Sequence, residues 1–148
     1  AQSWDLVQYL EPPQFESRYF YSDRSEFGTT IGVTDDNLVA VIGRILGQND
    51  AGTTRFMSLV KFQYSGGSWE YTGVISGEPG VMGFGLSIAL GPNRLFVGAP
   101  SDRYQYFGGT ISRQIQYIGQ VVVYVWGYDP AGRSTFTVNS RLDPVNRT

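Results

Sequence analysis

The sequence predicts an all-β fold built from two four-stranded antiparallel sheets. Its apolar runs are short, rich in β-branched and aromatic residues, and bounded by Gly, Pro, Asn or Asp. These turn formers interrupt every window in which a helical periodicity could develop. A set of segments also recurs 57 positions further along the chain, which indicates a duplicated structural unit.

Composition limits the classes of partner. The chain has 148 residues, of which 41% are hydrophobic and 16% charged, so one folded domain is expected. The formal net charge is −2 and no basic stripe is present, which argues against nucleic acid as a partner. No apolar run approaches the roughly 20 residues of a bilayer span, so no membrane insertion is expected.

The chain contains no His and no Cys. This excludes Ser-His-Asp and Cys-His nucleophiles, the usual zinc ligand sets, thiolate chemistry and disulfides. We therefore expect no cofactor and no metal.

The first unit is predicted at 27–76 and is preceded by an isolated strand. Residues 3–10 resemble 68–75, so they are expected to be the outer strand of a preceding unit. The strands expected within the first unit are 27–33, 38–42, 56–62 and 68–75. Ser65-Gly66-Gly67-Ser68 supplies a short hairpin turn between the last two.

The second unit is predicted at 84–142. The segment 27–33 aligns with 84–90, and 38–43 with 95–100, both at a separation of 57, so two strands and their turn are expected to repeat in register. Later strands are expected at 121–126 and 134–138, joined by the turn Asp129-Pro130-Ala131-Gly132. A long loop, 101–119, separates the second and third strands.

Three segments of the second unit resemble a known repeat. Phe84-Gly85 is followed by Gly98-Ala99-Pro100 and then by 119–126, a pattern similar to the FG-GAP repeat of integrin α-subunit β-propellers. The first unit keeps Phe27-Gly28 but has Val41-Ile42-Gly43 where the repeat has Gly-Ala-Pro. The resemblance implies propeller-type blades, and hence that residues 1–148 form part of a larger or oligomeric β-propeller.

The propeller interpretation assigns the motif residues to packing. Small residues allow inner strands to approach closely, and Phe27 and Phe84 are expected to wedge between sheets. A propeller has four to eight blades, so two cannot close a ring. Further blades or other protein chains are therefore expected as partners, and the strand 3–10 would pair with a neighbouring edge.

Neither calcium binding nor catalysis is expected. The turns 34–37 and 91–94 are too short to wrap a calcium ion with six to eight oxygens. Ser87 has no His to activate it. The carboxylates considered for glycosidase-like chemistry lie in separate loops and are Asp23, Glu26, Asp50, Glu78 and Asp102.

Two aromatic segments are the candidates for recognition, because rigid amphipathic side chains form large contacts at low entropic cost. They are the loop 101–119 and the segment 11–23, which are expected on one rim. The candidate protein- or glycan-binding residues are Arg103, Tyr104, Tyr106, Phe107, Arg113, Tyr117, Tyr19 and Tyr21. Coverage of an open flank is the alternative role for these aromatics.

Three functions follow as expectations. The first is a non-catalytic adhesion or assembly module that binds a protein partner, with an extracellular or particle-surface location implied by the resemblance. The second is a carbohydrate-binding, lectin-like module in which Tyr104, Tyr106 or Trp126 stacks on sugar rings. The third is a structural component of a virion or other large surface assembly. Asn146-Arg147-Thr148 is an N-glycosylation acceptor pattern, which would suit a secreted glycoprotein.

Overall fold

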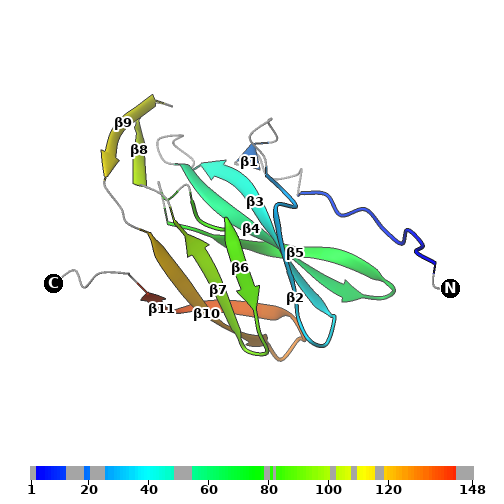
Figure 1. Cartoon of the computed structure of the whole chain (residues 1–148). Coiled ribbons are helices and arrows are strands. Elements are labelled where there is room, and N and C mark those ends of the chain that lie inside the picture. The colour runs from blue at the N-terminus through cyan, green and yellow to red at the C-terminus, as the bar shows by residue number, and fades with distance from the viewer. Residues whose placement is uncertain are drawn as a thin grey trace.

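A computed structural model describes residues 3–12, 19–20, 26–48, 55–78, 81, 83–100, 103–107, 110–115 and 119–142. All regular elements in these ranges are strands (Figure 1). They are β1 (Tyr19–Phe20), β2 (Thr30–Val33), β3 (Val39–Gln48), β4 (Arg55–Ser65), β5 (Ser68–Ser76), β6 (Ser87–Leu90), β7 (Arg94–Ala99), β8 (Arg103–Phe107), β9 (Thr110–Ile115), β10 (Gln120–Tyr128) and β11 (Ser134–Leu142). Across the ranges described, no helix is long and apolar enough to cross a bilayer.

The strands form the two antiparallel sheets that the sequence predicts. The first sheet runs β2-β3-β4-β5, and the short β1 extends the row of β2 along the same edge of β3. The second runs β6-β7-β10-β11. The all-β prediction and the four-strand composition of each unit are confirmed. No closed propeller is present in the described part of the chain.

The two sheets have the same local arrangement at their first two strands, β2–β3 in one and β6–β7 in the other. Thr30 on β2 pairs with Gly43 on β3, and Ser87 on β6 pairs with Gly98 on β7. In both cases a Cβ on the glycine would collide with the hydroxyl of its partner. The same short-range arrangement of a hydroxyl over a glycine thus occurs in each sheet.

The outer strands share a β-bulge. The register of β4 against β5 shifts between Lys61 and Phe62, and that of β10 against β11 shifts between Val123 and Tyr124. A bulge bends its strand and increases the local twist. The local twist between the third and fourth strands therefore increases at the equivalent step in both sheets.

The expected register of the repeat is wrong by two residues at the second strand. Val33 pairs with Ala40, whereas Leu90 pairs with Leu95, so the β6–β7 turn is two residues shorter than the β2–β3 turn. Gly43 is consequently the counterpart of Gly98, which the sequence alignment had placed elsewhere.

The main core lies between the two sheets. Phe84 and Val81, from the segment between β5 and β6, are buried there with residues of both sheets: Val41, Leu46, Met57, Leu59, Ile75, Leu95, Val97, Ala99, Val122 and Tyr124. A second cluster covers the other face of the first sheet, where Phe27 and Leu10 pack against Ala40, Ile42, Ile45, Val60 and Phe62. Phe84 thus packs between the sheets, and Phe27 packs on the outer face of the first sheet.

Residues 3–10 do not form the predicted strand. They have no backbone ladder with any described strand. The amide of Gln8 donates to the Trp69 carbonyl and accepts from the Trp69 N–H, both at 2.9 Å. The side chains of Trp4 and Val7 are exposed. A β-propensity pattern without a partner edge is insufficient for a strand.

The segment predicted as a long loop between β7 and β10 contains a hairpin instead. β8 and β9 pair antiparallel from Arg103↔Ile115 to Phe107↔Thr110. Figure 1 shows this hairpin projecting beyond the ends of the two main sheets.

Candidate functional site

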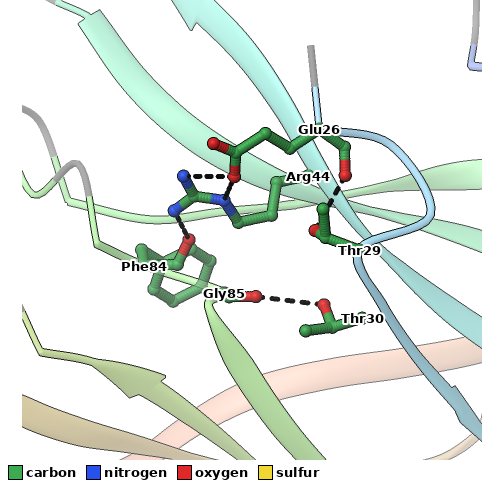
Figure 2. A network of polar contacts seen from close by, with 6 residues as sticks. All are labelled: Glu26, Thr29, Thr30, Arg44, Phe84 and Gly85. Carbon is green, nitrogen blue, oxygen red and sulfur yellow. Dashed lines mark hydrogen bonds and ion pairs between the residues drawn. The ribbon is translucent and has the colours of Figure 1, made fainter. Parts of the chain in front are cut away.

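The segments that lead into β2 and β6 meet at a buried arginine, Arg44 on β3. Its Nε donates to Glu26 Oε2 at 2.8 Å, and a second guanidinium nitrogen lies 2.7 Å from the same oxygen (Figure 2). Another guanidinium nitrogen donates to the Phe84 carbonyl at 2.9 Å. Arg44 thus joins the segment before β2 to the segment before β6, and its charge is compensated inside the joint.

A second contact runs beside it. The Thr30 hydroxyl donates to the Gly85 carbonyl at 3.0 Å, as Figure 2 shows. Gly85 has a φ of +88°, and a Cβ at this position would lie 2.8 Å from Leu59 Cδ2. Close approach of the sheets therefore requires glycine here. The polar groups of Arg44, Glu26, Thr30 and the segment Phe84-Gly85 bind one another, which indicates that they serve to connect the two sheets.

The other end of the interface contains Lys61, the single lysine of the chain. Its Nζ donates to the Ser134 carbonyl at 3.2 Å and lies 5.5 Å from the centroid of the Phe136 ring. Burial lowers the pKa of this ammonium group. Gln63 reinforces the contact by accepting from the Ser134 N–H at 3.1 Å and donating to the Gly132 carbonyl at 2.6 Å.

The turn 34–37, considered as a calcium loop, makes protein contacts. Asp36 accepts from the hydroxyl of Thr34, from the backbone N–H of Leu38 and, at 2.6 Å, from the hydroxyl of Tyr128. The hydrogen bond from Thr34, followed by that from Tyr128, lowers the pKa of Asp36. Burial and the bond to Asp36 raise the pKa of Tyr128 to about 12. The carboxylate therefore links the turn to the second sheet.

The carboxylates considered for catalysis are not brought together within the described residues. Glu26 pairs with Arg44, and Glu78 lies 2.7 Å from Arg141. Asp23, Asp50 and Asp102 lie outside the described residues.

Five predicted binding residues fall on the hairpin, whose register sorts them by face. Cross-strand partners share a face of a β-ribbon, and alternate residues of one strand do likewise. Tyr104 and Tyr106 therefore share one face with Ile111 and Gln114. The opposite face carries Arg103, Gln105, Phe107, Arg113 and Ile115.

The remaining predicted residues are placed only in part. Tyr19 lies on β1, which pairs with the end of β3 at Leu46 and Gly47. The hairpin follows the end of β7, the counterpart of β3, so β1 and the hairpin are at the same end of the sheets (Figure 1). Tyr21, Tyr117 and Asn146 lie outside the described residues.

Trp126 does not have the exposure that a sugar-stacking platform needs. It is buried, its Nε1 donates to the Gly91 carbonyl at 2.8 Å, and its ring stacks on Phe136 with the centroids 5.8 Å apart. The expectation that Trp126 stacks on a ligand is therefore wrong, because the indole is used in the core.

Sequence reasoning missed the residues that join the sheets, chiefly Arg44, Gln63 and Tyr128. A signal for one of them was present. Arg44 interrupts the apolar run 38–46, and a charged residue inside a buried strand needs a partner. Which partner it finds depends on tertiary structure, because Phe84 lies forty residues away.

Comparison with known proteins identifies no relative. No family model matches the chain, and no curated protein and no solved structure matches it either.

Proposed function

We propose that this chain is a non-catalytic adhesion or assembly module of the FG-GAP propeller type, which binds a protein partner through the β8–β9 hairpin at an extracellular or particle surface. The observation that carries the proposal is the position of the hairpin. It is inserted between the second and third strands of one sheet, and the equivalent connection of the other sheet, residues 49–54, is far shorter.

The sheet does not need this insertion for its own pairing. Ala99 at the end of β7 pairs with Gln120 at the start of β10, so the hairpin begins and ends at neighbouring backbone positions. Among the described elements, β8 and β9 make their extensive contacts with each other. An element that leaves a complete sheet and returns to the same place is well suited to recognition.

The two faces of the hairpin favour a protein partner. One face carries Tyr104 and Tyr106, and the other carries Arg103 and Arg113. Tyr and Arg are enriched at the energetic centres of protein interfaces. The FG-GAP resemblance supports the same class of function and implies further blades or other chains beside the two sheets.

The test measures binding to an array of purified cell-surface protein ectodomains. We expect the Tyr104→Ala/Tyr106→Ala double variant to lose a bound ectodomain by about tenfold or more. Arg103→Ala/Arg113→Ala is the matched control on the opposite face, and it identifies the face used. If both double variants bind like the unaltered chain, the hairpin is not the binding element.

Carbohydrate binding is the second candidate, since Tyr104 and Tyr106 share a face on which a sugar ring could stack. A glycan array probed with the unaltered chain and with the same two variants tests it. A signal that disappears only with the tyrosines would replace the protein-binding proposal. The third expectation, a component of a large surface assembly, requires association between chains.

A further inference from the structure

The contact between the two sheets joins unlike faces. We call the face that carries Phe27 in the first sheet, and Phe84 in the second, the Phe face, and the opposite one the back face. Within the chain, the Phe face of the second sheet packs on the back face of the first. A Cβ on Gly32 of the back face would lie 3.0 Å from Leu90 Cβ and 3.3 Å from Ile88 Cδ1. Such a contact leaves one face of each kind unmatched.

The Phe face of the first sheet is exposed to solvent at β2. Ile31 and Val33 on β2 hold the positions that Ile88 and Leu90 hold on β6, yet their exposures are 62% and 44%. Gly28, the counterpart of Gly85, has no described atom within 4 Å of its Cβ position. On β3 and β4 the residues of this face belong to the buried second cluster, so the exposed part of the face is confined to β2.

The back face of the second sheet is open at two apolar residues, Phe96 and Leu142. Phe96 pairs with Ala89 as Val41 pairs with Gly32, and Leu142 pairs with Val121 as Ile75 pairs with Leu59. In the first sheet Val41 and Ile75 are buried by the second sheet. In the second sheet, Phe96 is 41% exposed and Leu142 is 51% exposed.

We propose that a second copy of this chain docks head to tail, with Ile31 and Val33 of one copy on the back face of the second sheet of the other. Both halves of the contact are present on this one chain, and a template for it exists between its own sheets. One polar contact of that template is retained. Ser87 holds the position of Thr30, whose hydroxyl donates to the Gly85 carbonyl, so the Ser87 hydroxyl would donate to the Gly28 carbonyl of the second copy.

Sedimentation velocity of the full chain over a concentration series tests the proposal. We expect the unaltered chain to associate reversibly, and Ile31→Glu and Phe96→Glu each to weaken that association by about tenfold or more, because either charge would be buried against an apolar face. Each variant keeps one intact face. An equimolar mixture of the two is therefore expected to form a one-to-one heterodimer.

Val7→Glu, a charge added at an exposed residue that belongs to neither sheet, is the matched control and should associate like the unaltered chain. Circular dichroism verifies folding, and Leu142→Glu replaces Phe96→Glu if that variant does not fold. A monomeric unaltered chain, self-association of either variant alone, failure of the mixture to dimerise, or loss of association in Val7→Glu would each overturn the proposal. Binding through the hairpin is read separately, because Phe96→Glu leaves it unchanged.

Discussion

Single glycines decide how closely the two sheets can approach. Gly28 and Gly85 hold equivalent positions and both have positive φ, at +95° and +88°. They differ in surroundings, since only the Cβ position of Gly85 is crowded, by Leu59 and Arg44. Substitutions at these two positions therefore separate the free-energy cost of backbone strain from the cost of crowding between the sheets.

We expect Gly28→Ala to destabilise the fold by about 1–2 kcal/mol, which is the backbone cost of positive φ for alanine. Gly85→Ala should carry the same cost plus about 1–3 kcal/mol of overpacking against the first sheet. Urea unfolding of the two variants measures the difference. Equal losses would show that the close approach at Gly85 relaxes without cost.

Tyr124 makes the fold sensitive to alkaline pH. Burial raises its pKa to about 12 from the ordinary value of 10.0. The folded state holds the phenolic proton more tightly than the unfolded chain, so the stabilisation is complete below pH 10 and is lost as pH rises towards 12.

Tyr124→Phe removes this dependence. Between about pH 9 and about pH 11 the unaltered chain should lose roughly 1.4 kcal/mol more unfolding free energy than the variant. Urea midpoints at the two pH values measure it, and Tyr128 and Lys61 are common to both proteins. Parallel pH curves would contradict the assigned burial of the phenol.

At the level of elements, the positions of the strands in the two main sheets were predictable and their registers were not. Alternating patterns located the main strands, yet the alignment at a separation of 57 misplaced β3 against β7 by two residues. A shift of two returns every side chain to the same face, so hydrophobic alternation does not detect it. The length of the turn between the two strands determines the register. An alignment at one constant separation does not show that the β6–β7 turn is shorter than the β2–β3 turn.

The candidate site was predictable in composition and only partly in form. Tyr104, Tyr106 and Arg113 were predicted as candidates for recognition, in a segment expected to be a loop. Gly108-Gly109 between two alternating segments is a hairpin signal, and it was available in the sequence. Arg44 and Gln63 were not identified, because their partners lie on the other sheet.

Replacing residues 101–118 by a short turn should leave the stability of the sheets nearly unchanged. Ala99 and Gln120 already pair, so the new turn needs no rearrangement of β7 or β10. We expect a change in unfolding free energy within about 1 kcal/mol, since loop closure depends weakly on length. Thermal unfolding followed by circular dichroism measures it. A molten or insoluble product would show that the hairpin belongs to the core.

For the whole molecule, head-to-tail docking makes stability depend on concentration. Association that is selective for the folded state raises the melting temperature by mass action. We expect the melting temperature of the unaltered chain to rise over a hundredfold increase in protein concentration, and that of Phe96→Glu to stay constant, as calorimetry would measure. A constant value for both would contradict docking between copies.

The shared bulge has a consequence for protein engineering. Two sheets with few identical residues place it at the same pairing step, Lys61/Phe62 in one and Val123/Tyr124 in the other. Strand order, glycine pair and twist therefore form a backbone template that tolerates wide variation in side chains. Averaging the two halves into a consensus unit would yield a building block for tandem arrays, with the number of units chosen by the designer.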